Sequence, residues 1–555
     1  EVILRLYQEE GERCVDRLNG QWAFAIWDAP KQKLFLSRDR IGVRPLFYTQ
    51  TAKSFLFASE IKALLACPEV ECSLDLQALD QIFTLWVTVP PRTAFQNICQ
   101  LPPGHSLIAE NGRIRVFEYW RHDLAPQIDP RDDGEKRVAD ELLDLLLDAT
   151  RIRLRSDVPV GAYLSGGLDS TFITALAENI AGDRLKTFSV SFEDPEFDER
   201  GFQNEASAFL ETSHCAVCCS QGDIAAAFPD VIWHVEQPIL RTAPVPLFLL
   251  SKLVRDNGFK VVLTGEGADE MFGGYDIFQE VKIREFWARR PNSVSRPLLL
   301  KRLYPYLQGI QRQSPDYLKR FFHVAQDDLA SPFFSHLPRW ELTAKLKTFL
   351  SREVRQQLQP DGALADLERS LPDSYASLRR FSQAEHLEAR YLLPGYILSS
   401  QGDRVAMAHG VEGRYPFLDH RVVALAAKLP IRLKMKVLDQ KYLLRRAARG
   451  WIPESIRKRH KQPYRAPDGR SFFGMKSGYA DEMLSAAQIQ RNGTFDHRAV
   501  DALVNKFRSG RPTSTKDDMA LVGILSTEIL LDRFRNERRQ PSQKVPVRDA
   551  QVTIA

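Results

Sequence analysis

The pattern of hydrophobic positions changes character once along the chain. Before about residue 120, short apolar and aromatic runs are separated by polar turns, a pattern typical of β-hairpins. We therefore predict a β-rich N-terminal part with three hairpins. The paired runs lie at 21–27 with 33–36, at 46–48 with 54–57, and on either side of Asn111-Gly112, a turn dipeptide.

Beyond a polar stretch the period becomes helical, because Val138, Leu142, Leu145 and Leu146 fall at helical spacing. Strand-like and helix-like segments then alternate, which favours a parallel, doubly wound α/β sheet. After about residue 280 the pattern is mostly helical. The strand candidates are 158–164, 185–192 and 259–263, and the helix candidates are one that begins at Thr171 and one near 247–255.

These shifts divide the chain into two domains, as its length of 555 residues also suggests. The first domain is expected over 1–122 and the second over 136–535. A Pro- and Asp-rich linker is expected over 123–135, and a polar, disordered tail over 536–555.

The overall charge balance excludes few classes of function and gives no sign of a polyanionic partner. The chain holds 76 basic and 71 acidic side chains, a net charge of +5. Nucleic-acid binders concentrate a larger excess on one face, and the basic run 457–461 is interpreted as a solvated helix end or loop. No apolar stretch reaches the roughly 18–20 residues of a membrane helix. We expect neither a nucleic acid nor a membrane as partner.

Cysteine usage points to the redox setting. Seven cysteines at uneven spacing do not resemble a secreted disulfide framework, which favours a reducing, cytoplasmic location. His214, Cys215, Cys218 and Cys219 lack a second ligand pair at matching spacing for zinc. We interpret them as part of a strand with buried thiols.

Residues 165–170, Ser-Gly-Gly-Leu-Asp-Ser, lie between a strand candidate and a helix candidate. Two consecutive glycines let backbone N–H groups approach an anion, and the helix N-terminus adds partial positive charge. Ser165 and Ser170 add hydroxyl donors. A bare phosphate cradle would not favour a carboxylate, so Asp169 is interpreted as a ligand of the Mg²⁺ that accompanies a polyphosphate. No Gly-Lys-Ser/Thr follows, so the loop is not of the Walker type.

A second Gly-rich strand exit, 264–270, carries Glu266, Asp269 and Glu270 within five residues. Three carboxylates so close are costly to hold together unless a cation or a substrate neutralises them. Magnesium pyrophosphate would do so. Lys441, late in the chain, can return to this site as a point charge for a developing phosphate charge.

The string 165–170 resembles the PP-loop of ATP pyrophosphatases, which split ATP between the α and β phosphates. With further motifs it is similar to the synthetase domain of asparagine synthetases, preceded by the latter part of an α+β, Ntn-hydrolase-type class II glutamine amidotransferase domain. The resemblance runs from near residue 1 to about residue 530. Its motifs are 18–28, 38–48, 57–62, 156–161, 165–170, 264–275, 403–419 and 441–445.

The resemblance implies an ATP-dependent ligase that adenylates the side-chain carboxylate of aspartate. Ammonia then displaces AMP, which yields asparagine, AMP and pyrophosphate. Glu266 and Lys441 would be catalytic, the first assisting the attack of ammonia and the second contacting the phosphates. Asp169 and Asp269 would hold Mg²⁺. The residues implied for ATP and pyrophosphate are Leu164, Ser165, Gly166, Gly167, Asp169, Ser170, Val190, Thr264, Gly265 and Asp269.

Three charged residues in the 403–419 motif, Asp403, Glu412 and Arg414, are implied for the substrate or intermediate site. The family also pairs through its amidotransferase half, which implies a homodimer.

The glutaminase half departs from the family pattern. That half uses an N-terminal cysteine whose α-amino group serves as base, together with Arg-His-Arg-Gly and Asn-Gly-Glu segments, and these 555 residues contain none of them. Cys14 is neither terminal nor followed by Gly-Ile. The chain as written is therefore expected to have no glutaminase nucleophile. Either the sequence is a fragment, as its start without Met favours, or the enzyme uses free ammonia.

A second departure concerns the acceptor. The segment 234–244 differs from the Asp-Glu-Pro type common in the family, and it precedes the Glu266 strand. Aspartate is the leading acceptor, and another carboxylate on a peptide, cell-wall or secondary-metabolite substrate is the alternative. An RNA-modifying PP-loop enzyme would need a basic face or a thiolation cysteine pair. A non-catalytic descendant is disfavoured by the intact acidic residues and Lys441.

Overall fold

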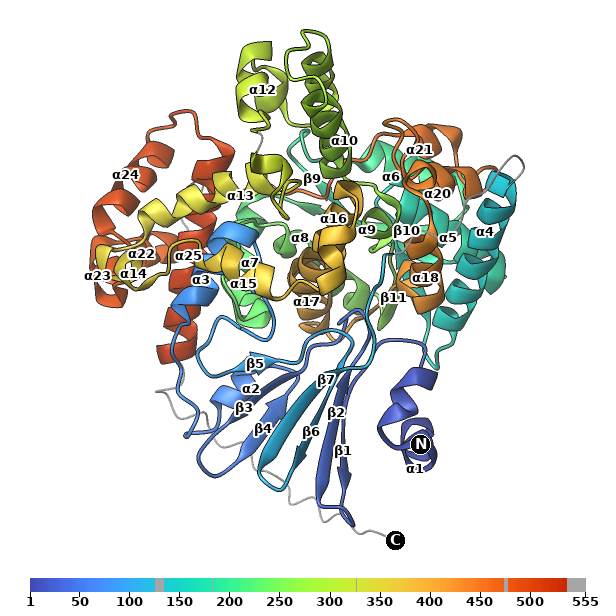
Figure 1. Ribbon diagram of the computed structural model, residues 1–555, viewed down its shortest axis with the longest axis horizontal. Helices are drawn as coiled ribbons and strands as arrows, with labels where there is room; N and C mark the ends of the chain where they lie inside the picture. Colours follow the sequence, from blue (N-terminus) through green and yellow to red (C-terminus); the bar gives the residue numbers. More distant parts are fainter. Residues whose placement is uncertain (125–133, 183, 326, 474–477, 537–555) are drawn as a thin grey trace.

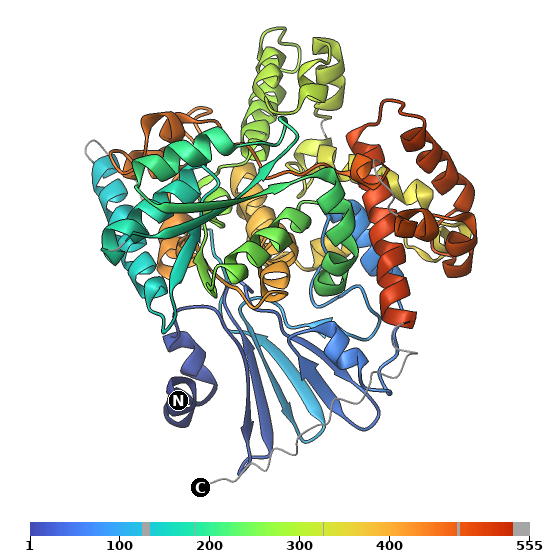
Figure 2. The same cartoon turned by 180° about the vertical axis from the view of Figure 1, so that it is seen from behind.

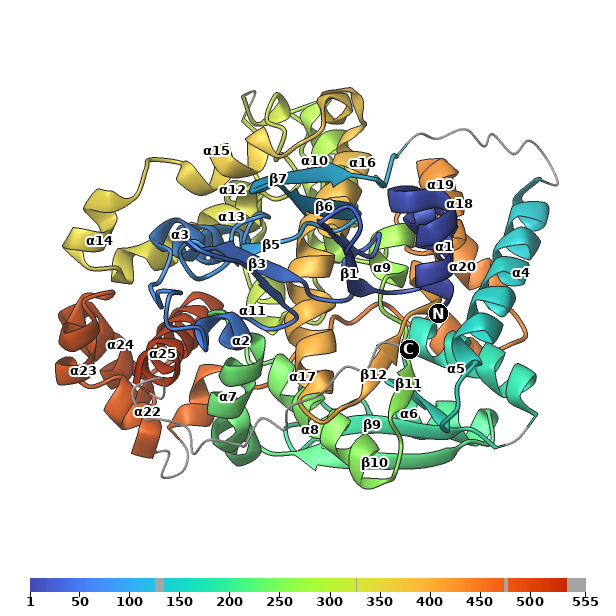
Figure 3. The same cartoon turned by 90° about the horizontal axis from the view of Figure 1, so that it is seen from below.

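The computed structural model describes residues 1–124, 134–182, 184–325, 327–473 and 478–536. Its N-terminal part contains two small antiparallel sheets, and the residues from 134 onward surround a five-stranded parallel sheet with helices (Figures 1 and 2). Seen from the side of the N-terminal part, the small sheets lie over the region of helix α17 (Arg404–Met407) (Figure 3).

All three predicted hairpins are present as antiparallel pairs, β1 with β2, β3 with β4, and β6 with β7. Two helices in this part carry no clear sequence signal and are not among the predicted elements, α1 (Val2–Glu10) and α3 (Leu76–Leu85). The strands are β1 (Ala23–Asp28), β2 (Lys33–Arg38), β3 (Phe47–Gln50), β4 (Phe55–Ala58), β5 (Cys99–Gln100), β6 (His105–Glu110) and β7 (Arg113–Glu118).

The parallel sheet has the order β10-β9-β8-β11-β12, which confirms the predicted doubly wound α/β fold. The chain leaves β8 toward β9 on one side, whereas β11 lies on the other side. The point between β8 and β11 is therefore a topological switch point, where α/β sheets bind ligands. The strands are β8 (Val160–Tyr163), β9 (Lys186–Phe192), β10 (Ser213–Cys219), β11 (Val261–Leu263) and β12 (Glu412–Arg414).

Several element boundaries differ from the prediction. Helix α4 (Gly134–Leu154) includes the last two residues of the expected linker, of which 125–133 lie outside the described residues. Helix α5 (Leu168–Ala181) begins three residues before Thr171, and α25 (Thr515–Asn536) ends where the expected tail begins. Residues 537–555 also lie outside the described part. The early start of α5 places Asp169 in its first turn.

The cysteines on β10 differ from one another. Cys219 is buried, and burial raises the pKa of its thiol to about 12, whereas Cys215 is half-buried and Cys218 is exposed. The interpretation of buried thiols therefore holds only for Cys219. The strand alternates its faces, so neighbouring cysteines cannot all point inward. No helix in the described ranges is long and apolar enough to cross a membrane.

Residues 276–322, here called the arm, stand off the main body (Figures 1 and 2). The arm contains α10 (Asp276–Ala288), the short helical segment η2 (Arg296–Arg302), α11 (Gln308–Gln311) and α12 (Pro315–Phe321). It has a small hydrophobic core of its own. The buried members of this core are Ile283, Trp287, Leu300, Leu303, Leu318 and Phe322.

Candidate active site

The loop 165–170 lies at the carboxyl end of β8. Leu164 is fixed to β9, because its N–H donates to Phe188 O at 2.9 Å and its carbonyl accepts from the Ser189 hydroxyl. The hydroxyls of Ser165 and Ser170 lie 2.9 Å apart across the loop. Their hydrogen bond closes the loop in front of α5.

Two glycines of this loop meet different requirements. Gly166 has a φ of +73°, and a Cβ there would lie 2.6 Å from the backbone carbon of Phe202. Gly167 is the N-cap of α5 and provides no side-chain hydrogen bond to the first turn. The N–H groups at this helix end therefore face the loop without a side-chain partner, as an anion site requires.

The exit of β11 packs directly against the first turn of α5. A Cβ on Gly265 would lie 2.8 Å from Ser170 N, so only glycine permits this approach. Thr264 N–H donates to Arg414 O at 3.0 Å. Val190, on β9, is buried, and its carbonyl accepts from Gln203 at 2.9 Å.

Two carboxylates and two lysines meet between these strand exits. Lys441 Nζ lies 2.5 Å from Asp169 Oδ2 and 2.6 Å from Asp269 Oδ1. Lys461 Nζ lies 2.7 Å from Asp269 Oδ2 and 3.7 Å from Asp169 Oδ2. Burial raises the pKa of Asp269, but the two lysines outweigh it and hold that pKa below its usual value. Burial lowers the pKa of Lys461, but the two aspartates outweigh this effect and raise that pKa above its usual value.

Gly274 forms part of the same cluster. Its Cα lies so close to Asp269 Oδ1 and Lys441 Cε that a Cβ would overlap both atoms. Any side chain at this position would displace the two charged groups.

Some buried groups at this site have no hydrogen-bond partner. They include Asp169 Oδ1, Glu266 Oε2 and the hydroxyls of Tyr163 and Tyr464. Burial raises the pKa of Glu266, while Thr264 and Lys461 lower it. Burial, and then the charge of Glu266, raises the pKa of Tyr163. Buried polar groups are normally paired, so this set marks a place where a ligand would supply the partners.

The carboxylates at this site could bind Mg²⁺ only if substrate phosphates supplied further ligands. No cluster of three or more His, Cys, Asp or Glu that could hold a metal ion by itself occurs in the described ranges. Mg²⁺ is commonly held by one or two carboxylates together with substrate phosphates. Asp169, with its unpartnered Oδ1, and Asp269 meet that requirement.

The three residues expected at the substrate or intermediate site form the following contacts. Asp403 forms an ion pair with Arg44 of the N-terminal part, and Glu412 lies 3.8 Å from the same guanidinium. Arg414 pairs with Glu412 at 2.7 Å and donates to two backbone carbonyls at the end of α4. The structure brings these residues together at the interface between the two parts of the chain.

Lys461 belongs to the run interpreted above as solvated, and that interpretation is wrong for Arg459 and Lys461. Lys458 does lie at the surface, beside Glu454. By contrast, Arg459 pairs with Glu199 at 2.5 Å and donates to Gly166 O at 3.2 Å. Helix α21 (Glu454–Lys458) ends just before Arg459, and in the extended segment that follows, alternate residues share a face. This alternation is the sequence signal that distinguishes Arg459 and Lys461, which contact the candidate site, from the exposed residues of the run.

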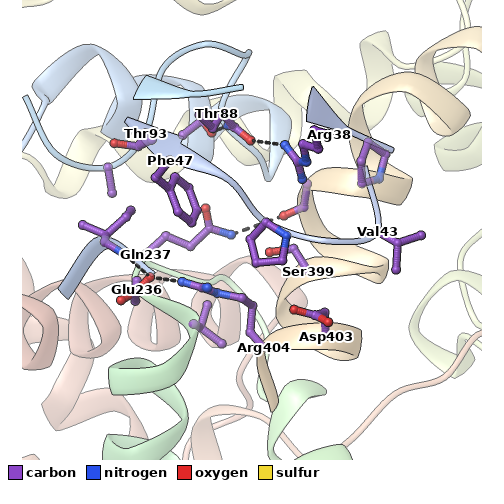
Figure 4. A pocket seen from close by; sticks show the side chains of 17 residues that line it. Arg38, Val43, Phe47, Thr88, Thr93, Glu236, Gln237, Ser399, Asp403 and Arg404 are labelled. Atoms are coloured by element: carbon purple, nitrogen blue, oxygen red, sulfur yellow. Dashed lines mark hydrogen bonds and ion pairs between the residues drawn. The ribbon is translucent and has the colours of Figure 1, made fainter. Parts of the chain in front are cut away.

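A cavity of about 40 Å³ lies at the interface of the two parts (Figure 4). Glu236 is completely buried beside it and accepts from Ile61 N and Lys62 N at 2.8 Å each. Arg404 completes an ion pair with the same carboxylate, and Gln237 donates to the Ser400 hydroxyl at 3.0 Å. Other lining residues include Arg38, Phe47, Thr88, Gln100 and Asp403.

The unusual segment 234–244 therefore contributes to this interface. Further along it, Arg241 pairs with Asp468 at 2.7 Å and lies over the ring of Trp86.

Comparison with known proteins gives matches over both parts of the chain. A family model described as "Asparagine synthase" matches residues 141–532, and one described as "Glutamine amidotransferase domain" matches residues 1–120. The chain is 30% identical to asparagine synthetase [glutamine-hydrolyzing] 1 of Bacillus subtilis over 470 residues, which cover 84% of this chain and 71% of the relative. Asparagine synthetase [glutamine-hydrolyzing] 3 of the same organism is 31% identical over 479 residues, 84% of this chain and 70% of the relative. Amidase chyE of Penicillium rubens is 28% identical over 541 residues, 91% of this chain and 78% of the relative.

Proposed function

This chain belongs to the asparagine synthase family of ATP-dependent ligases, and from that premise we propose that it adenylates a carboxylate at the loop 165–170 and then amidates it. The observation that carries this proposal is the neutral cluster of Asp169, Asp269, Lys441 and Lys461 beside Glu266, whose Oε2 has no hydrogen-bond partner. Leu164, Val190, Thr264 and Gly265, at the ends of β8, β9 and β11, would line the nucleotide.

In the first step a carboxylate oxygen of the acceptor attacks the α-phosphorus of ATP, and pyrophosphate leaves. Negative charge then grows on the departing phosphate oxygens. Lys441 and Lys461 lie where they can neutralise it, and in many enzymes charge stabilisation of this kind contributes more to the rate than any other effect. The loop amides hold the phosphates. Asp169 and Asp269 would hold Mg²⁺, which neutralises phosphate charge when bound.

In the second step ammonia attacks the acyl carbon, and AMP leaves with the bonding electrons. The nitrogen must lose a proton as the amide forms. Glu266 is suited to accept it, because burial raises the pKa of its carboxylate and so increases its affinity for a proton. The products are an amide, AMP and pyrophosphate.

We propose aspartate as the acceptor and ammonia, free or released from glutamine, as the nitrogen source. The two asparagine synthetases of Bacillus subtilis support aspartate, and the amidotransferase match over residues 1–120 supports glutamine as the origin of the ammonia. We further propose domain boundaries at 1–122 and 136–535 and a homodimer formed through the N-terminal part.

A second candidate is an amidoligase that acts on another carboxylate. Two observations favour it. The amidase chyE matches 91% of this chain, a larger share than the asparagine synthetases match. The segment that departs from the common family pattern also carries Arg241, which is paired with Asp468.

The proposal is tested by measuring pyrophosphate, AMP and amide from ATP, magnesium and ammonia with aspartate and with a panel of other carboxylic acids. Equal amounts of pyrophosphate, AMP and amide are expected. Formation of ADP would contradict the adenylation chemistry, whereas activity with another acid and none with aspartate would change only the acceptor.

The role of Glu266 is tested by Glu266→Gln. Acid-dependent exchange of pyrophosphate into ATP should persist in this variant while amide formation falls by about 10²–10³-fold, a normal range for a lost proton acceptor. Glu454→Gln, an exposed carboxylate of α21, serves as the matched control.

A further inference from the structure

The arm carries most of the excess positive charge of the molecule. Residues 276–322 contain ten basic side chains and four acidic ones, Asp276, Glu280, Glu285 and Asp316. Their excess of six exceeds the net charge of +5 over the whole chain, so the other residues together carry a net charge of −1. The basic residues of the arm are Lys282, Arg284, Arg289, Arg290, Arg296, Lys301, Arg302, Arg312, Lys319 and Arg320.

Most of this charge faces solvent. Arg284 is buried with Glu280 and has a structural role, but Arg290, Arg302 and Arg320 are exposed and have no acidic partner among the described residues. Lys319 has only a loose pairing with Asp316, at 3.6 Å. Exposed, unpaired cations of this density repel one another unless an anionic surface neutralises them.

Apolar side chains protrude among these cations. Val294 is 79% exposed and Leu298 56% exposed, and both lie in or beside the turn that joins α10 to η2. Phe286 and Tyr317 add two further exposed rings on α10 and α12. A single exposed apolar side chain is ordinary on a protein surface, whereas four of them among the basic residues of one segment favour an interaction site.

The turn that presents Val294 is ordered by its own hydrogen bonds. Arg290 N–H donates to Trp287 O at 2.9 Å, Ser293 N–H to Arg290 O at 3.0 Å, and Arg296 N–H to the Ser293 hydroxyl at 3.2 Å. The guanidinium of Arg296 lies 4.0 Å from the centre of the Phe286 ring. The arm's own hydrophobic core lies beneath this turn, so the exposed residues sit on a rigid base.

We propose that the arm binds the surface of a membrane that contains anionic lipids. Basic residues that surround a few inserted apolar side chains are the pattern of interfacial membrane binding, in which charge attracts and apolar area anchors. The shape agrees, because the arm projects from the body, and a flat bilayer can contact a projecting tip without meeting the rest of the molecule (Figures 1 and 2). The proposed contact is with the membrane surface and does not cross the bilayer. The small net charge of the whole chain gives no sign of this partner, because acidic residues elsewhere offset the basic arm.

The test is sedimentation of the full chain with vesicles of phosphatidylcholine alone and with about one third phosphatidylglycerol. Binding is expected only to the anionic vesicles and should weaken with salt. Arg290→Ala with Arg302→Ala should lower the affinity about 25-fold, about fivefold for each charge. Val294→Ser with Leu298→Ser should lower it about tenfold and leave the salt dependence intact.

Matched controls lie far from the arm. Lys136→Ala with Arg137→Ala removes two exposed cations from α4, and Val2→Ser removes a 70% exposed valine from α1. Neither should change vesicle binding, and pyrophosphate release should be normal in all four variants. Equal binding to both vesicle types, or no binding, would overturn the proposal. Retention on a heparin column without vesicle binding would overturn it in favour of a polyanionic macromolecule.

Discussion

Two buried clusters of carboxylates and cations in this molecule differ in how fully their atoms are paired. At the interface of the two parts, Glu236 accepts two backbone N–H groups and pairs with Lys62 and Arg404. At the active site, Asp169 uses only one of its oxygens, and Glu266 leaves Oε2 without a partner.

This difference in pairing distinguishes the ion-pair cluster around Glu236, here called the clamp, from a candidate binding site. A buried charge is tolerable when hydrogen bonds and counter-charges satisfy it, and Glu236 meets that condition within the protein. Glu236 also binds the N-terminus of helix α2 (Ile61–Leu65), so one part of the chain caps a helix of the other. The carboxylates of the candidate site keep acceptor positions open, as the binding of a substrate or an ion requires. Each of the following changes tests that distinction.

The largest effect is expected from Glu236→Gln. The change removes the negative charge that compensates Arg404 in the interface, and breaking such a buried pair costs about 3–5 kcal/mol in the free energy of unfolding. Chemical denaturation would measure the loss. Glu412→Gln is the control, because Glu412 also pairs with arginines, Arg414 at 2.7 Å and Arg44 at 3.8 Å, but is 39% exposed. It should cost less than about 1 kcal/mol. Equal losses in the two variants would show that the clamp does not stabilise the interface.

Lys461→Met should lower the rate of pyrophosphate release by about 10²–10³-fold, the cost of losing one charge-stabilising group. Its effect on unfolding should be smaller than that of Glu236→Gln, because Lys441 remains beside both aspartates. Steady-state assays and denaturation of the same sample measure both quantities. Lys458→Met, on the exposed side of the same basic run, should leave the rate unchanged. A Lys461→Met enzyme with a normal rate is incompatible with the proposed cluster.

Gly274→Ala should lower activity by about 10²-fold, because its Cβ would overlap Asp269 and Lys441 and shift them from their positions. The Michaelis constant for ATP and the turnover number would be measured separately. The control is Gly201→Ala in helix α6 (Arg200–Phe209), where a Cβ would meet no atom within 4 Å. This alanine should instead stabilise the fold by roughly 0.5–1 kcal/mol. If both alanines behave alike, steric contact at Gly274 is not the cause.

The smallest effect concerns pH. Burial, and then the neighbouring Asp269, raises the pKa of Glu270 to about 8. The folded state therefore holds a proton that the unfolded state releases near pH 4.5, so this group's contribution to stability is lost as the pH rises through that window. Between pH 6 and 7.5 the loss reaches at most about 2 kcal/mol. Glu270→Gln should make the decline measured by denaturation at these two values less steep without abolishing it, because burial also raises the pKa of Glu528 to about 8. Glu454→Gln should leave the decline as it is.

The sequence predicts the backbone path of the loop 165–170 well because its determinants are contiguous. Six residues between a strand and a helix define both the backbone path and the donors, and the structure retains that arrangement. The prediction misses only the start of α5, which lies three residues nearer the loop. Local patterns likewise indicate the hairpins and the order of strands and helices.

Long-range pairing explains what the sequence could not reveal. Strand β12 has the sequence Glu-Gly-Arg and lacks an apolar run, and it becomes a strand only because β11 lies beside it. Asp403 forms its ion pair with Arg44, which lies 359 residues earlier in the chain, so no local pattern reveals this contact. The local pattern places Lys461 in solvent because its two counter-charges, Asp169 and Asp269, are also distant in sequence.

The wide separation of these partners has a consequence for the order in which the protein matures. Lys461 follows the loop 165–170 almost 300 residues later in the chain, so it is synthesised well after the loop. At about 5–20 residues per second, translation keeps the two apart for roughly 15–60 s. A nascent chain in that interval has the loop without its second lysine, so it cannot turn over ATP by the proposed route. The site acquires its full charge only when most of the helical C-terminal part has emerged.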